Sequence, residues 1–101
     1  MEKFVIELYT IFGARKGTMS IERSGEAVSG EIDLLGRRNP FQGSRLSDLT
    51  LSLHGELKGI YRPLAYTMSC KINDHTISGV LNTAGGHMRL RGVQDQHEED
   101  T

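Results

Sequence analysis

The chain has 101 residues, of which 37% are hydrophobic and 25% are charged, and its formal net charge is −1. This composition is typical of one globular domain with a modest core, and it excludes a disordered chain, a basic nucleic-acid-binding surface and a membrane-length apolar run. The single cysteine excludes an intramolecular disulfide, and the first residues lack the layout of a signal peptide. We therefore expect a cytoplasmic protein.

Apolar and polar residues alternate through the whole chain and are interrupted by turn residues, a pattern that predicts β-strands rather than helices. In chain order we expect strands at 3–12, 17–23, 26–35, 38–43, 50–59, 64–73, 75–84 and 87–93. Ser24-Gly25 and Asn73-Asp74 predict tight turns. Pro40 predicts an edge or a bulge in the fourth strand, because proline has no amide hydrogen to donate.

The sequence repeats itself at an offset of 49 residues. Residues 4–43 align with residues 53–92 without a gap, and ten of the 40 aligned positions are identical. Ordinary residue usage would give about two or three identities at an arbitrary offset. The triplet Thr-Met-Ser at 18–20, for example, recurs at 67–69. We therefore predict two copies of a four-stranded meander, related by a rotation near two-fold.

Four strands alone leave two open edges and one apolar face, so the two meanders are expected to close on each other. We predict an all-β fold: an internally duplicated, eight-stranded, antiparallel up-and-down barrel. A two-sheet β-sandwich is the alternative. The barrel would be one domain of residues 1–94, and the acidic residues 95–101 would form a disordered tail.

Gly30 and Gly79 occupy equivalent positions of the two repeats, on the inward side of the alternation. A glycine within a strand allows a sheet to bend tightly, and this is the first interpretation of both positions. The second interpretation is that they leave room for a ligand. In that case Gly30→Val would abolish ligand binding without unfolding the domain.

The sequence contains no recognisable catalytic or metal-binding motif. His54 with Glu56 as its orienting carboxylate is the alternative that a catalytic base would require, but two such neighbours on an open strand face usually only solvate one another. His87 has no partner at metal-ligand spacing, and Cys70 falls on the inward side of its strand, where it packs as a small apolar residue. We therefore expect no enzyme activity, no metal site and no cofactor.

The function that this pattern favours is a non-catalytic barrel that binds a small apolar or amphipathic ligand, with an anionic head group as one variant. Three arginines near Phe41, within residues 36–45, favour anion recognition; the alternative is a set of solvated charges that protects a strand edge. The candidate ligand-contacting residues are inward-facing apolar side chains and arginines at the rim, namely Phe12, Met19, Leu34, Arg37, Arg38, Tyr61, Met68, Met88 and Arg89.

The alternative function is a structural or protein-interaction module that acts through its outer face or as a homodimer. Several apolar residues fall on the outward side of the alternation, namely Val5, Tyr9, Ile11, Leu35, Ile60, Val80 and Val93. The first and last strands of a barrel are neighbours, so Val5, Ile11 and Val93 are expected to lie side by side. We expect no nucleic-acid or membrane partner.

Overall fold

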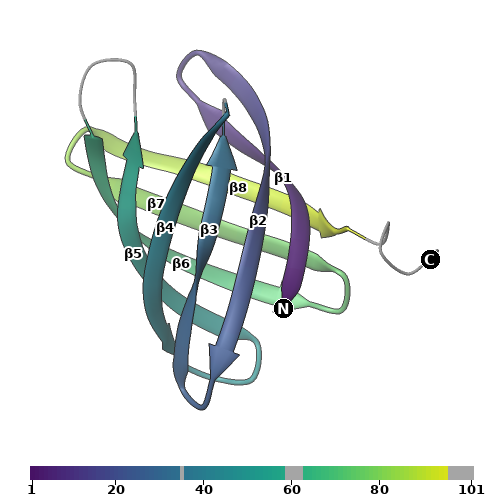
Figure 1. The fold of residues 1–101 in the computed structure, drawn as a ribbon. Coiled ribbons are helices and arrows are strands. Elements are labelled where there is room, and N and C mark those ends of the chain that lie inside the picture. The colour runs from purple at the N-terminus through teal and green to yellow at the C-terminus, as the bar shows by residue number, and fades with distance from the viewer. Residues whose placement is uncertain (35, 59–62, 96–101) are drawn as a thin grey trace.

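The chain folds as a closed barrel of eight antiparallel β-strands (Figure 1). The computed structural model describes residues 1–34, 36–58 and 63–95. Each strand pairs with the next one along the chain, and β8 pairs with β1 to close the barrel. The predicted up-and-down barrel is confirmed, and the alternative sandwich is wrong. The strands are β1 (Glu2–Thr10), β2 (Gly13–Ser24), β3 (Ala27–Leu34), β4 (Arg37–Arg45), β5 (Thr50–Lys58), β6 (Pro63–Asn73), β7 (Thr76–Thr83) and β8 (Gly86–Gln94).

The alternation of apolar and polar residues builds the core of the barrel. In β6, Tyr66, Met68, Cys70 and Ile72 are buried, and the residues between them are exposed. Successive side chains of a strand point to opposite faces, so each strand sends one apolar set inward. The buried apolar residues are Phe4, Ile6, Leu8, Met19, Ile21, Val28, Ile32, Phe41, Leu51, Leu53, Leu57, Tyr66, Met68, Cys70, Ile72, Ile77, Leu81 and Leu90.

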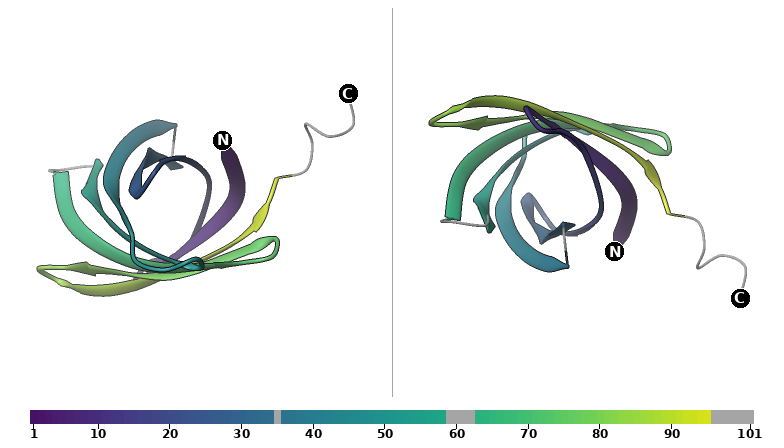
Figure 2. Two further views of the ribbon diagram at one scale, coloured as in Figure 1. Left: turned by 90° about the horizontal axis from the view of Figure 1, so that it is seen from below. Right: turned by 90° about the horizontal axis from the view of Figure 1, so that it is seen from above.

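The barrel is flattened rather than round. Seen along its length, β7 and β8 form a nearly flat layer, and β3 and β4 arch on the opposite side (Figure 2). The turns that follow β1, β3 and β7 lie at the upper end of the barrel in the orientation of Figure 1. We call this the upper end.

The turns and the proline behave as the sequence predicts. Gly25 and Asp74 have positive φ angles of 63° and 56° in the turns that follow β2 and β6. The ladder between β4 and β5 joins residues 41–45 to residues 51–55 and does not include Pro40. We call the unladdered part, residues 37–40 of β4 and 56–58 of β5, the seam.

The pairing registers of the two repeats agree within each half. Phe4 pairs with Met19, and 49 residues later Leu53 pairs with Met68. The same offset of 49 residues relates the register of β2 with β3 to that of β6 with β7. It also relates the register of β3 with β4 to that of β7 with β8. Sequence positions that match in the repeat therefore occupy matching places in the two meanders.

The two junctions between the halves differ in register. Gly43 pairs with Leu53 across β4 and β5. The equivalent partner of Gly92 would be Phe4, but Gly92 pairs with Ile6 across β8 and β1. This shift of two residues breaks the symmetry of closure. The superposition of the two halves stays a prediction, because registers do not measure it.

The prediction that Phe12 faces the interior is wrong. β1 ends at Thr10, and the turn at residues 11 and 12 interrupts the alternation, so Phe12 is 78% exposed. Thr10 organises this turn: its hydroxyl donates to the carbonyl oxygen of Gly13 at 2.8 Å and accepts from the amide of Phe12 at 3.1 Å. The turn, and not the strand period, sets the direction of this side chain.

Gly30 and Gly79 face inward as predicted, but they leave no room for a ligand. A Cβ atom at Gly30 would lie 2.7 Å from Cζ of Phe41 and would collide with the carbonyl oxygen of Ser20, and one at Gly79 would lie 2.8 Å from Cβ of Cys70. These glycines therefore permit the close approach of neighbouring strands, as the curvature interpretation predicts. Because a side chain at Gly30 would displace a neighbouring strand, we now expect Gly30→Val to destabilise the fold.

The chain beyond β8 is described only as far as Asp95. Its amide donates to the carbonyl oxygen of Lys3 at 2.8 Å, so the first residue of the predicted tail is attached to the barrel. Residues 96–101 lie outside the described residues, as do Leu35 and Ile60. Within the described ranges, no helix is long and apolar enough to cross a membrane.

Candidate ligand-binding site

Tyr66 places a buried hydroxyl group inside the barrel near its upper end. The residue lies on the inward side of β6 and is 3% exposed. Its hydroxyl has no hydrogen-bond partner among the described residues. Burial raises the pKa of Tyr66 to about 12, and Cys70 adds to this rise, so the hydroxyl keeps its proton at neutral pH. Buried polar groups are nearly always hydrogen-bonded, so this donor needs an explanation.

The ring of Tyr66 fills the space opposite a glycine of the neighbouring strand. Tyr66 pairs with Gly55, and a Cβ atom at Gly55 would lie 3.1 Å from the Tyr66 hydroxyl. The other half of the barrel has the reverse arrangement, in which Ile6 pairs with Gly17. In the first copy the large residue of this pair, Ile6, is on β1, and in the second copy the large residue, Tyr66, is on β6. Only the second copy therefore places a polar side-chain group at this pair.

Asn39 holds the seam together. It is 1% exposed, and its side-chain amide donates to the carbonyl oxygens of Ile32 at 3.0 Å and Arg37 at 3.1 Å. Its Oδ1 atom accepts from the amide of Lys58 at 2.7 Å. Because Pro40 has no amide to donate, this side chain supplies a connection across the seam that the backbone ladder does not.

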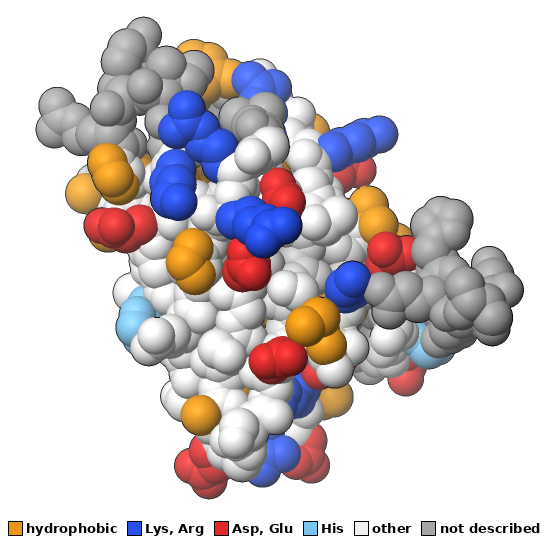
Figure 3. All heavy atoms as spheres, viewed as in Figure 1, with side chains coloured by type: hydrophobic (Ala, Val, Ile, Leu, Met, Phe, Trp, Pro, Cys, Tyr) orange, Lys and Arg blue, Asp and Glu red, His pale blue; other side chains and the backbone are white. Residues whose placement is uncertain are grey.

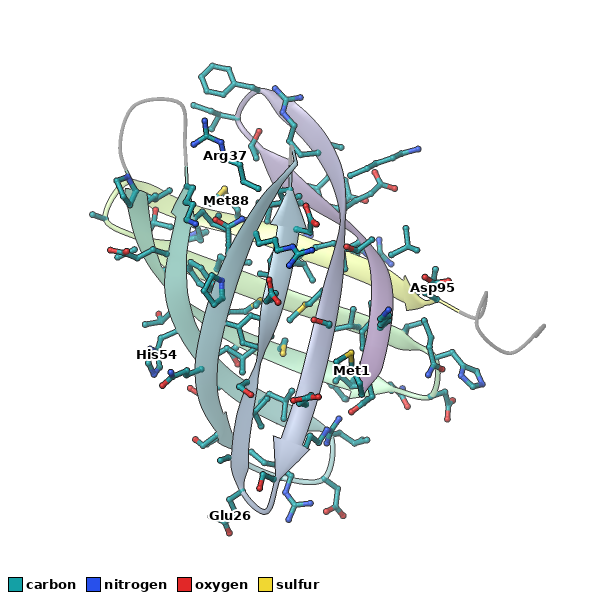
Figure 4. All side chains as sticks on the ribbon, viewed as in Figure 1. Met1, Glu26, Arg37, His54, Met88 and Asp95 are labelled. Carbon is teal, nitrogen blue, oxygen red and sulfur yellow. The ribbon has the colours of Figure 1, made fainter. Side chains whose placement is uncertain are left out.

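Leu34 and Met88 complete the inner surface near the upper end. Both are partly buried and pack against the core. Figure 4 shows Met88 toward the upper end, where Arg37 also lies. Met88 stands where the first repeat has Asn39. An unbranched methionine adapts easily to a new neighbour, so this is the most deformable part of the inner surface.

The structure brings only some of the predicted ligand-contacting residues together. Leu34 and Met88 lie at the upper end, whereas Met19 and Met68 are each 1% exposed and belong to the packed core. Phe12 is in the exposed turn described above. Tyr61 lies outside the described residues.

The three candidate arginines do not form one group. Arg37 and Arg38 are exposed at the start of β4, near the upper end. Arg89 is exposed on β8 and pairs with Tyr9 and Val80, both of which face outward. Arg89 therefore belongs to the outer face and not to the rim of the interior.

Two hollows lie on the outside of the barrel. One of about 780 Å³ covers the outer face from β2 to β5 and reaches Gly55, Lys58 and Pro63 beside the seam. A second, of about 510 Å³, lies on the outer face of β6 to β8. Because the inward-facing side chains pack together as one core, a ligand inside the barrel would require the upper end to rearrange.

Cys70 and the two candidate histidines form no catalytic arrangement among the described residues. Cys70 is 2% exposed, and burial raises the pKa of its thiol to about 11, although Arg23 opposes the rise. The thiolate is the reactive form, so this thiol is inert at neutral pH. His54 is exposed between Gln42 and Thr67 of the neighbouring strands, and no hydrogen bond joins it to Glu56, on the same face of β5, among the described residues. His87 is exposed on β8 and pairs with Asn82.

Sequence reasoning missed the two most informative residues of the site, Tyr66 and Asn39. Tyr66 lies on the same side of the alternation as Met68 and Cys70, and this pattern could have identified it as an inward-facing tyrosine. Asn39 stands beside Pro40, where a side chain is needed to replace a missing backbone bond. Only the three-dimensional arrangement shows that Asn39 bridges the seam and that the Tyr66 hydroxyl lies over Gly55, at its edge.

Comparison with known proteins supports the fold and names no natural relative. The redesigned β-barrel b11L5F_LGL is similar, with a TM-score of 0.72 and 12% identity over 94% of this chain and 90% of that chain. The redesigned β-barrel mFAP1, in a structure bound to DFHBI, has a TM-score of 0.69 and 13% identity over 92% of each chain. No family model and no curated protein match the chain. Identity this low shows the fold alone.

Proposed function

We propose that this chain is a non-catalytic barrel that binds one small apolar or amphipathic molecule through the upper end of its interior. The observation that carries the proposal is the buried hydroxyl of Tyr66, which has no partner among the described residues. A ligand with a hydrogen-bond acceptor would satisfy this donor. Apolar pockets with a few placed polar groups are typical of small-molecule sites.

The ligand in this proposal lies between the Tyr66 hydroxyl and the upper end, against Leu34 and Met88. Both side chains are only partly buried, and displacement of Met88 creates space at a lower cost than displacement of the tightly packed Met19 or Met68. If the ligand carries an anionic head group, that group would face Arg37, which lies near the same end. The structure of mFAP1 bound to DFHBI supports the proposal only by indicating that a barrel of this architecture can bind a small molecule.

Titration with prodan tests this proposal. Prodan is a neutral, apolar dye with a carbonyl acceptor, and its fluorescence changes when it leaves water. We expect saturable binding to the wild type and about tenfold weaker binding to Tyr66→Phe, the loss expected for one buried hydrogen bond. Tyr9→Phe is the matched control, because it removes the same hydroxyl from a side chain that is 41% exposed on the outer face. Absent saturable binding, or equal affinity of Tyr66→Phe and wild type, would overturn the proposal.

The interaction module remains a second candidate because of one observation on the outer face. Val5 pairs directly with Val93 across the closure of the barrel, and the two are 45% and 57% exposed. Ile11, which was expected beside them, instead lies in the turn after β1 and is 93% exposed. Adjacent exposed valines favour self-association.

Sedimentation equilibrium tests the homodimer that this candidate implies. A concentration-dependent dimer should weaken in Val5→Lys and persist in Ser29→Lys, which adds the same charge to the outward side of β3. A chain that stays monomeric at all concentrations, or a dimer that both variants weaken equally, excludes this surface.

A further inference from the structure

The outer face of β6 and β8 gathers three cationic side chains. Lys71 and Arg91 both pair with Ser78 of the intervening strand β7, so the three residues form one row across the sheet. Arg89 lies two residues from Arg91 on the same face of β8. Strand geometry separates Lys71 from Arg91 by about 10 Å and Arg89 from Arg91 by about 7 Å at the backbone. Their long side chains can therefore reach a shared point above the sheet.

Hydroxyl groups line the hollow that these cations surround. The hollow has a volume of about 510 Å³, and all three cations lie along it. Thr50, Ser69 and Ser78 contribute hydroxyls, and no carboxylate belongs to the lining in the described part of the chain. Arginine and lysine donors together with hydroxyls suit the oxygen atoms of an anion.

The cations of this hollow form no close ion pair with the protein among the described residues. None of them takes part in an ion pair; the ion pairs in this part of the chain include Arg23 with Glu2 and Arg45 with Asp48. Glu7 of β1 pairs in register with Arg91 and lines the adjoining outer hollow with it, so its carboxylate offsets part of the charge of Arg91, whereas Lys71 and Arg89 have no carboxylate as a ladder partner. Like charges on one face repel one another to an extent that salt reduces, and a bound anion would relieve this repulsion.

The opposite side of the barrel has a different charge pattern. Figure 3 shows acidic and basic side chains interleaved over the face that β2, β3 and β4 present to the viewer. The hollow on that side includes Glu22, Glu31 and Glu56 in its lining. The concentration of cations on β6 and β8 is therefore a local property and not a consequence of the net charge, which is −1.

We propose that the hollow on the outer face of β6 to β8 binds a compact oxyanion, such as a phosphate group, through Lys71, Arg89 and Arg91. A guanidinium group presents two parallel donors to such an anion, and the lysine adds a third positive charge. The phosphate group can belong to a soluble molecule or to a lipid head group, since both present the same chemistry. This site is separate from the interior and does not depend on the proposed barrel ligand.

Chemical-shift titration of the backbone amides with inorganic phosphate tests this proposal. The wild type should show saturable shifts confined to β6, β7 and β8, and Arg91→Gln should weaken binding about tenfold. Lys58→Gln is the matched control, because it removes one positive charge from the hollow on the other side of the barrel. Raising the salt concentration should weaken binding, because this site is exposed.

A second arm uses vesicles of phosphatidylcholine with and without phosphatidic acid. Binding to the phosphatidic acid vesicles alone, lost in Arg91→Gln and kept in Lys58→Gln, supports the proposal and identifies a lipid source. Saturable binding of inorganic phosphate supports it and identifies a soluble source. The proposal is overturned if neither probe binds, or if Arg91→Gln and Lys58→Gln weaken binding equally, because the effect is then one of net charge.

Discussion

Replacement of Asn39 by alanine should destabilise the barrel strongly. The side chain is 1% exposed and makes three hydrogen bonds, at 3.0 Å to Ile32, 3.1 Å to Arg37 and 2.7 Å to Lys58. A typical hydrogen bond contributes about 1 kcal/mol to stability, so Asn39→Ala should lower the free energy of unfolding by about 3 kcal/mol. In a domain of this size, that loss corresponds to a fall in Tm of roughly 12–24 °C.

Urea denaturation followed by circular dichroism measures this loss, and Gln42→Ala is the matched control. Gln42 is an exposed polar residue of the same strand, so its replacement should change stability by less than about 0.5 kcal/mol. Hydrogen exchange adds a local measurement: the amide of Lys58 should lose protection in Asn39→Ala, because Asn39 Oδ1 accepts its hydrogen. A stability loss below about 1 kcal/mol, with the Lys58 amide still protected, would refute the role of Asn39 in the seam.

Three further changes test the interior. Gly30→Ala should lower the free energy of unfolding by at least about 2 kcal/mol in urea denaturation, because its Cβ would collide with a neighbouring strand, whereas Ser29→Ala should have little effect. Tyr66→Phe should leave stability unchanged or raise it by up to about 2 kcal/mol, since it removes a buried hydroxyl without a partner; a loss above about 1 kcal/mol would show that the hydroxyl is satisfied. Burial raises the pKa of Cys70 from 9.0 to about 11, so the folded state keeps the thiol proton that the unfolded chain releases first. The corresponding stability, on the order of 2–3 kcal/mol, is present below pH 9 and lost as the pH rises to 11. Denaturation across this range should show a smaller loss in Cys70→Ala; an equal loss in both chains would contradict the assignment.

The strands were predictable because the alternation of residues reports directly which face of a sheet is buried. Met68 and Cys70, for example, share the buried side of β6 as expected. The alternation fails where a turn sets the direction of a side chain, and Phe12 is exposed for this reason. It also gives no account of how two strands that are distant in the sequence meet, so the two-residue difference between the junctions was not foreseen.

The candidate site was less predictable than the fold, because it depends on which groups lack partners. The alternation places Tyr66 inside the barrel, but only the structure shows that its hydroxyl meets no acceptor among the described residues. Likewise, Arg89 and Arg91 are adjacent in the sequence pattern, but Lys71 joins them only through the pairing of β7 with both of its neighbours. A cluster that spans three strands is invisible without the register.

Native mass spectrometry of the chain purified from its own host tests the central proposal most directly. We predict a small molecule bound at one per chain in the wild type, with lower occupancy in Tyr66→Phe and unchanged occupancy in Tyr9→Phe. The mass of the bound molecule would then identify its chemical class. A wild-type chain that carries no ligand, or a ligand whose occupancy does not depend on the Tyr66 hydroxyl, would contradict the proposal that this barrel binds its ligand at the upper end of its interior.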